Sequence, residues 1–269
     1  MPELPEVETT LRGIRPYVEN RTISKLIVRN RQLRWPVPKA LIDARDIEIG
    51  AITRRAKYIL LESSLGTIVS HLGMSGSLRV ITDNSRPRKH DHIDWLVAEG
   101  DKIRYHDPRR FGALLLVTDT NQDKLFSHLG PEPLSDAFNA EYLREAIKRK
   151  AAPIKPSLMD QKTVVGVGNI YASESLFMSG ISPLTPANKL SATQLATVCD
   201  NIKYVLQRSI DQGGTTLRDF VNSDGKPGYF AQQLFVYGRH GETCRRCESK
   251  IEKITQAQRA TFFCPTCQH

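Results

Sequence analysis

The sequence predicts an α+β fold in three successive parts, and three observations support this prediction. The first part of the 269-residue chain contains short segments rich in β-branched residues and bounded by Gly, Asn, Asp or Pro, which is typical of antiparallel strands. The middle part carries apolar residues at helical spacing. Four of the five cysteines lie between residue 244 and the C-terminus, which indicates a metal-bound module rather than a disulfide framework.

A helix is predicted to begin within the first six residues, MPELPE. Pro5 suits the first helical turn, and Val7, Leu11 and Ile14 follow at spacings of four and three, which places them on one apolar face. The N-terminus of this helix carries the positive end of its dipole. One interpretation of the segment is therefore a proline-rich helix cap with two acids that interact with the dipole.

The second interpretation of the same segment is chemical. A small second residue favours removal of the initiator methionine, which would leave Pro2 as a free secondary amine followed by the carboxylate of Glu3. An α-amino group has an intrinsic pKa near ~8, against ~10.4 for a lysine. Pro2 is therefore a candidate nucleophile near neutral pH without deep burial.

Strands dominate the chain up to about residue 117, and several short antiparallel strands indicate a sandwich. The polar and basic segment Asn84–His92 is expected to be an exposed loop. The predicted strands are Ile23–Val28, Tyr58–Glu62, Thr67–His71, Leu78–Thr82, Ile93–Val97, Lys102–Tyr105 and Ala113–Val117.

The character of the chain changes around Leu129–Pro133, and we place a domain boundary near residue 131. We expect domains at 1–131, 132–234 and 235–269, with a mobile, turn-rich loop over Ser223–Gln233. Helices are predicted at Ala140–Lys150, Ile170–Met178, Ala192–Ser209 and Thr216–Val221.

The C-terminal cysteines form two C-x-x-C pairs separated by sixteen residues, which strongly indicates a closed tetrahedral zinc site. The partly alternating stretch between the pairs predicts a hairpin, so the module is a zinc ribbon. Four thiolates leave no open position, and the zinc is expected to be structural. His240 and His269 are expected at the surface and Cys199 in the core. The four ligands are Cys244, Cys247, Cys264 and Cys267.

A formal charge of +9 and a pI near 9.4 suit a polyanionic partner, although a merely basic protein fits these values equally well. The acidic, proline-broken start does not resemble a secretory signal. No apolar run approaches the ~20 residues that span a bilayer. We therefore expect a soluble protein that lies in the cytoplasm and binds no membrane.

Five further positions have both a functional and an ordinary interpretation. Lys57, at a strand end, contacts phosphate or is solvated. The turn Asp107–Gly112 inserts into DNA, or it is a surface turn with Phe111 tucked beneath it. Met74, in a glycine-rich turn, is expected in the core. Asn169 is an N-cap residue next to a possible phosphate site. Arg259, near the hairpin turn, is solvated or contacts nucleic acid.

Together these segments closely resemble the formamidopyrimidine-DNA glycosylase family over the whole chain. The resemblance implies a two-sheet β-sandwich with the N-terminal helix, a helix-two-turn-helix domain and a zinc ribbon. It also implies base-excision repair of double-stranded DNA that contains oxidised purines or abasic sites, by a monomeric bacterial protein at the nucleoid. The motifs are MPELPEVE, RRAKYILLE, HLGMSGSLR, KHDH, DPRRFG, HLGPEPLS, GVGNIYASE, QGGTTLRDF, DGKPGYF, VYGR and the two C-x-x-C pairs.

The resemblance also implies roles for single residues. Pro2 would attack the sugar and form a Schiff base, and Glu3 would be the general acid. Strand cleavage would follow by β- and δ-elimination. Lys57 and Arg259 match positions assigned to proton transfer or phosphate binding. The residues that match DNA-binding positions are Met74, His90, Arg109, Phe111, Lys150 and Asn169.

Two other functions remain open on the sequence. The related endonuclease VIII type shares the N-terminal proline chemistry but favours oxidised pyrimidines; Leu4, the Met74, Arg109 and Phe111 trio, and the loop 223–233 favour the purine enzyme. The third possibility is a zinc-ribbon protein that binds DNA without catalysis, in which Pro2 is only a helix cap. Intact Pro2, Glu3 and Lys57 argue against it.

Overall fold

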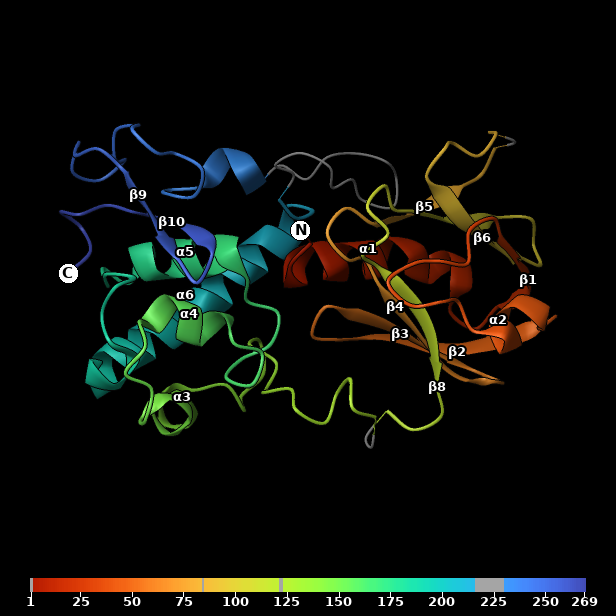
Figure 1. The fold of residues 1–269 in the computed structure, drawn as a ribbon, viewed down its shortest axis with the longest axis horizontal. Helices are drawn as coiled ribbons and strands as arrows, with labels where there is room; N and C mark the ends of the chain where they lie inside the picture. Colours follow the sequence, from red (N-terminus) through yellow and green to blue (C-terminus); the bar gives the residue numbers. More distant parts are fainter. Residues whose placement is uncertain (1, 84, 121–122, 216–229) are drawn as a thin grey trace. The chain divides into compact units, whose positions relative to one another are not determined.

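The structure is a computed structural model that describes residues 2–83, 85–120, 123–215 and 230–269, and it divides into two compact units (Figure 1). The first unit comprises Met1–Ser127 with Ile210–Ala231, and the second comprises His128–Ser209 with Gln232–His269. The predicted helix 216–221 and most of the predicted loop 223–233 lie outside the described residues.

The first unit contains an eight-stranded antiparallel sheet in the order β5-β7-β6-β1-β2-β3-β4-β8. Only two residue pairs, Thr22–Glu48 and Ile23–Ile47, join β1 to β2, so this pairing divides the sheet into two halves. Both halves contribute to one apolar core, which agrees with the predicted sandwich. The strands are β1 (Thr22–Val28), β2 (Ile47–Arg55), β3 (Tyr58–Ser63), β4 (Gly66–His71), β5 (Ser77–Ile81), β6 (Asp91–Val97), β7 (Lys102–His106) and β8 (Ala113–Val117).

The N-terminal helix α1 (Leu4–Val18) lies against the sheet, as predicted, and contacts β2 in one half and β5 in the other (Figure 1). Its apolar face is almost fully buried, with Val7 and Leu11 each 1% exposed and Ile14 0% exposed. Because this face is held by both halves of the sandwich, the residues just before α1 are anchored to its shared core.

Two elements of this unit were not predicted. Strand β2 contains Gly50 and a shift of register between Ile49 and Ile52, which interrupts its alternating pattern. Helix α2 (Lys39–Asp43) is only five residues long and starts after Pro38. Both are stabilised by burial in the shared core rather than by local sequence, for Leu41 and Ile47 are 0% and 1% exposed.

The second unit consists of helices and the C-terminal hairpin. Apolar residues of α5, among them Phe177, share a small core with Val236, Ile251 and Phe262 of the cysteine-bearing segment. The hairpin therefore belongs to the same compact unit as the helices. The elements are α3 (Ala140–Ile147), α4 (Ile154–Met159), α5 (Asn169–Met178), η1 (Ala187–Lys189), α6 (Ala192–Asp211), η2 (Phe230–Gln233), β9 (Glu252–Gln256) and β10 (Arg259–Phe263).

Several smaller expectations for this part of the chain are confirmed. Helices α3, α5 and α6 start where helical spacing predicted them to within one residue, and Cys199 is 3% exposed on α6. His240 and His269 are exposed. Across the described ranges, no helix is both long and apolar enough to cross a membrane.

Candidate active site and nucleic-acid interface

The candidate nucleophile and acid lie immediately before α1. Pro2 is buried, and Glu3 is 3% exposed. Glu6, in the first turn of α1, accepts a hydrogen bond from the Glu3 backbone N–H through Oε2 at 2.7 Å. Its second oxygen, Oε1, accepts the backbone N–H of Thr215 at 2.8 Å. One carboxylate therefore ties the N-terminal residues to a segment far along the chain.

Glu6 is a functional candidate that the sequence argument missed. Its side chain is 2% exposed, and a buried carboxylate is costly unless its oxygens are hydrogen-bonded. Two backbone donors and the positive end of α1 supply that compensation. The available signal was its position three residues after Glu3, which is that of a capping box and which the structure forms.

Lys57 lies in the tight turn between β2 and β3, and of its two interpretations the ordinary solvated lysine does not hold. It is 8% exposed, and the preceding Ala56 is fully buried with φ of 54°. A non-glycine residue in that region is uncommon and is retained only where the surroundings enforce it. The turn therefore presents Lys57 inward rather than to bulk water.

His71, at the end of β4, lies close enough to Lys57 for the lysine charge to lower its pKa. Burial lowers the pKa of His71 to about 4, and the positive charges of Lys57 and Arg34 add to this effect. The imidazole is therefore neutral at pH 7. Its Nδ1 accepts the backbone N–H of Gly73 at 3.1 Å, which holds the start of the glycine-rich turn.

Met74 and Phe111 project from two neighbouring loops, and the expectations that Met74 is in the core and Phe111 tucked away are both wrong. Their side chains are 37% and 46% exposed. The Arg109 guanidinium lies over the Phe111 ring, 4.8 Å from its centroid. An open cavity of about 730 Å³ lies beside these loops and is also lined by Arg34 and His71.

His90 is half-buried at the end of a largely exposed basic loop. The predicted loop extended to His92, but Asp91 and His92 begin β6 and are only 2% and 5% exposed, because this end of the strand pairs with β7. Its ring stands edge-on to those of His92 and His106, with centroids 6.3 and 6.0 Å away. His106 is anchored by Asp91, whose Oδ1 lies 2.7 Å from Nδ1. The His90 ring is thus packed against two other imidazole rings, one of which is held by a hydrogen bond to Asp91.

Asn169 starts α5 but is not the N-cap that was expected; that position belongs to Gly168. The Asn169 side chain is held sideways, since Oδ1 accepts from Lys155 Nζ at 2.5 Å and Nδ2 donates to the Ala260 carbonyl at 2.8 Å. Ala260 directly follows Arg259, which is exposed at the start of β10 beside the hairpin turn. The fold therefore brings together Asn169 and Arg259, two sequence-distant candidates for phosphate contact.

Two further polar side chains brace this unit. Lys150 is half-buried, and its Nζ donates to Asp160 Oδ2 at 2.8 Å and to Thr163 Oγ1 at 2.7 Å. Glu174, 1% exposed on α5, accepts three consecutive backbone N–H groups of residues 235–237 at 2.7 to 2.9 Å. Burial raises the pKa of Glu174 against the opposing effect of these donors. Sequence analysis missed Glu174, although an acid inside an apolar helix was a usable signal.

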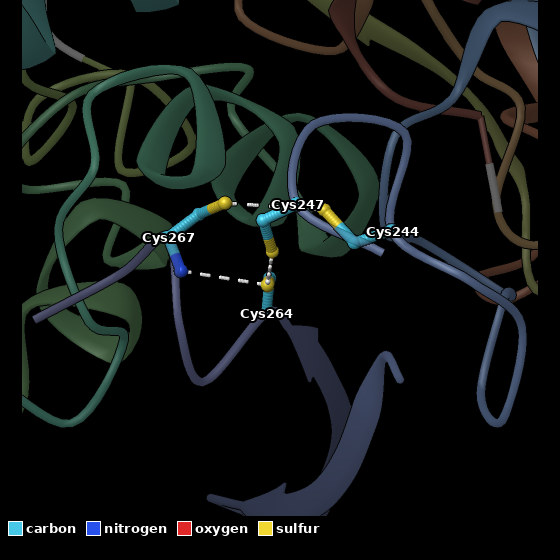
Figure 2. Close-up of side chains that lie close together, drawn as sticks. All are labelled: Cys244, Cys247, Cys264 and Cys267. Carbon is cyan, nitrogen blue, oxygen red and sulfur yellow. Dashed lines mark hydrogen bonds between the residues drawn. The ribbon is translucent and has the colours of Figure 1, made fainter. Parts of the chain in front are cut away.

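The four cysteines converge from the two ends of the C-terminal hairpin, with their sulfur atoms facing one another (Figure 2). All four sulfurs lie within 4.8 Å of one another, and the Cys244–Cys267 and Cys247–Cys264 separations are 3.9 and 3.4 Å. A tetrahedral zinc with bonds of about 2.3 Å requires sulfurs about 3.8 Å apart. The cluster therefore fits a four-thiolate zinc ion with no position left for a substrate.

Comparison with family models matches three consecutive parts of the chain. Residues 1–114 match the formamidopyrimidine-DNA glycosylase N-terminal domain, residues 129–221 its H2TH domain, and residues 241–269 the zinc finger found in FPG and IleRS. The last match contains all four clustered cysteines, and the chain accordingly holds one structural zinc ion.

Similar proteins cover the chain from end to end. A formamidopyrimidine-DNA glycosylase of Yersinia enterocolitica is 55% identical over 269 residues, which is 100% of both chains. The MutM (FPG) protein of Thermus thermophilus has 37% identity and a TM-score of 0.88, and it covers 99% of this chain and 98% of its own. A Lactococcus lactis FPG mutant bound to Fapy-dG-containing DNA has 33% identity, a TM-score of 0.91 and full coverage of both chains.

Proposed function

Because the chain belongs to the formamidopyrimidine-DNA glycosylase family, it is a DNA glycosylase of base-excision repair, and we propose that it excises oxidised purines through a covalent intermediate on Pro2. The observation that carries this proposal is the buried Pro2–Glu3 pair, held before α1 by the Glu6 hydrogen bond. A secondary amine with an intrinsic pKa near ~8 suits nucleophilic attack near neutral pH. The helix dipole disfavours its protonated form, while the carboxylates of Glu3 and Glu6 favour it.

In the proposed first step, the Pro2 nitrogen attacks C1′ of a damaged nucleotide that has been flipped out of the duplex. The C1′–base bond breaks, the base leaves with its bonding electrons, and the departing base takes up the proton that the attacking Pro2 nitrogen loses. Glu3 donates a proton to the sugar ring oxygen, so the ring opens and an iminium forms between Pro2 and C1′. Flipping costs a few kcal/mol, and less for a damaged base, which contributes to lesion selectivity.

Strand cleavage follows because the iminium withdraws electrons from the sugar. Loss of a proton from C2′ expels the 3′ phosphate, and a second elimination expels the 5′ phosphate. Lys57 and Arg259 are the proposed groups for proton transfer or phosphate binding in these steps. The buried position of Lys57 in the β2–β3 turn supports a role beyond solvation.

DNA binding is proposed to use candidates from both units. His90, Lys150 and Asn169 contact phosphates, while Met74, Arg109 and Phe111 fill the gap that the flipped nucleotide leaves. The exposure of Met74 and Phe111 supports this role, because exposed apolar side chains on loop tips are the kind that wedge between base steps. We propose that zinc has no chemical role and instead shapes the hairpin that carries Arg259.

We further propose the sequence domains 1–131, 132–234 and 235–269, and a monomer that acts on the bacterial chromosome in the cytoplasm.

The covalent step is tested by borohydride trapping, which reduces an iminium to a stable amine and cross-links the protein to the lesion strand. We expect the adduct to map by peptide analysis to the mature N-terminus. A residue retained before Pro2 converts the amine to an amide and should abolish trapping and base release together. An adduct on Lys57 or another lysine, or excision by the N-terminally blocked protein, would overturn the mechanism.

The role of Glu3 and the lesion class are tested separately. Glu3→Gln should impair base excision yet retain much of the cutting at a preformed abasic site, where no base remains. For the lesion class, single-turnover cleavage of 8-oxoguanine:C, 8-oxoguanine:A and thymine-glycol:A duplexes should be fastest for 8-oxoguanine:C. Fastest cutting of the thymine-glycol duplex would identify an endonuclease VIII-type specificity.

A further inference from the structure

We propose that Asp107 is a positioning residue that locks the loop of Met74 to the loop of Arg109 and Phe111, so that the three side chains enter DNA as one rigid wedge. The inference rests on the proposed function, since it assumes that these side chains occupy the gap left by the flipped nucleotide. Asp107 does not touch DNA in this proposal; it acts through the two loops.

The Asp107 carboxylate lies at the meeting point of both loops and is fully buried, with 0% exposure. Its Oδ1 accepts the Ser75 hydroxyl at 2.8 Å and the Arg109 backbone N–H at 3.3 Å. Its Oδ2 accepts the Gly112 backbone N–H at 2.9 Å and lies 3.4 Å from the Tyr105 hydroxyl. One side chain therefore binds the residue after Met74 and both ends of the Arg109–Gly112 segment.

The two loops also approach each other closely along their backbones. A Cβ at Gly73 would lie 2.4 Å from the Phe111 carbonyl carbon, and Gly73 has φ of +64°. A Cβ at Gly112 would lie 1.7 Å from the Tyr105 hydroxyl. These glycines permit the contact, and the Asp107 carboxylate supplies the hydrogen bonds that hold it.

The backbone of Asp107 links the wedge to a candidate phosphate contact. Its carbonyl accepts a hydrogen bond from His92 Nε2 at 2.8 Å, and its N–H donates to the His90 carbonyl at 3.0 Å. Since a carbonyl oxygen only accepts, the proton lies on Nε2 of His92. Asp107 therefore helps to fix the positions of both His90, a candidate DNA contact, and the loop that carries Phe111.

The rigidity of this arrangement has a physical purpose. Exposed apolar side chains on a loose loop would fold back onto the protein surface to escape water. A wedge must instead stay extended before DNA arrives, because ordering it during insertion adds an entropic cost. A buried carboxylate with several donors is suited to this task, since removing it leaves those donors unsatisfied.

The sharpest test uses Ser75→Ala, with Ser70→Ala as the matched control. Ser75→Ala removes a hydroxyl that donates to Asp107 Oδ1 at 2.8 Å and accepts the Arg109 backbone N–H at 3.3 Å. Ser70 is also buried, at 1% exposure, but its hydroxyl has no hydrogen-bond partner among the described residues. Single-turnover excision from an 8-oxoguanine:C duplex should fall about tenfold in Ser75→Ala, the size of one hydrogen bond to a charged acceptor. Ser70→Ala should excise at the wild-type rate.

Two further readouts separate positioning from general damage to the fold. Cleavage of an abasic site in single-stranded DNA needs no wedge, so Ser75→Ala should retain it within about twofold. In a Met74→Ala background the Ser75→Ala effect should become smaller, because one of the three side chains that it positions is gone. Asp107→Asn should show the same split between duplex and single strand, with a larger loss on the duplex.

The outcomes distinguish this inference from the proposed function. Wild-type protein that neither excises nor traps would refute the proposed function itself. An active wild type whose Ser75→Ala variant is unchanged on the duplex, loses single-strand cleavage in parallel, or adds fully to Met74→Ala would overturn the role of Asp107. If Asp107→Asn does not fold, the Ser75→Ala series decides the question alone.

Discussion

Substituting Glu6 with glutamine should slow the proposed covalent step without removing any reacting group. Glutamine keeps one acceptor oxygen and places an NH₂ group where the second oxygen stood. That NH₂ would face the backbone N–H of either Glu3 or Thr215, which now lie 2.7 and 2.8 Å from the carboxylate oxygens. One buried donor then has no acceptor, and the segment that carries Pro2 loses its support.

The expected decrease in the single-turnover rate follows from the loss of one hydrogen bond to the Glu6 carboxylate. A hydrogen bond to a charged acceptor contributes about 1.5–3 kcal/mol. If this energy serves to align Pro2, the single-turnover rate falls about 10- to 150-fold. Glu19→Gln is the matched control, since Glu19 flanks the other end of α1 and also accepts a backbone N–H, that of Ile52 at 3.0 Å.

The assay compares base excision from duplex DNA with borohydride trapping at a preformed abasic site. Glu6→Gln should reduce both, because Pro2 is the proposed nucleophile in both reactions, whereas Glu3→Gln should reduce mainly the first. Glu19→Gln should leave both near the wild-type level. A folded Glu6→Gln protein with wild-type rates, or equal losses in Glu6→Gln and Glu19→Gln, would refute the reasoning.

Three other predictions concern the metal, salt and pH. Cys247→Ser should lose the zinc ion and weaken binding to lesion DNA about tenfold or more, because metal binding supplies the folding energy of such modules; zinc-free protein with wild-type affinity would contradict this. The slope of log K against log salt should be steeply negative, roughly −0.9 per phosphate contact, and a flat titration would exclude a phosphate-dominated interface. For His71, whose folded pKa of about 4 lies below the ordinary value of 6.5, the unfolded chain binds the proton first on acidification. Stability should thus decrease by up to about 3 kcal/mol between pH 6.5 and 4, and denaturant titrations of His71→Asn should show a smaller decrease.

The elements that were predictable share a strong local pattern. The strands and long helices that were recognised alternate or repeat in their apolar residues, and the two C-x-x-C pairs fix the metal site by spacing alone. Strand β2 is different, because Gly50 and a register shift interrupt its alternation and its partners lie elsewhere in the chain. Helix α4 includes Pro156 and has only six residues, so burial and not propensity maintains it.

The sequence was sufficient to name the candidate site residues but not to predict how buried each one is or what it contacts. Resemblance named Lys57, Met74 and Asn169. Residue-level reasoning left Lys57 open and misplaced the other two, because burial of a turn lysine or exposure of a methionine depends on distant segments. Asp107 and Glu6 escaped notice for the same reason. Asp107 accepts from Ser75, 32 positions away, and Glu6 accepts from Thr215, 209 positions away. No local pattern indicates such a pairing.

The first unit is discontinuous, and this determines when during synthesis it is completed. Residues 1–127 leave the ribosome long before residues 210–231, which belong to the same unit. Until Thr215 has been translated, one oxygen of the Glu6 carboxylate lacks its donor, and the reactive N-terminus is held by only part of its final support. The most distant contact of the site is also the last to form, since closing a longer loop costs more entropy. A nascent chain therefore completes the support of its proposed nucleophile only after most of the helical unit has been made.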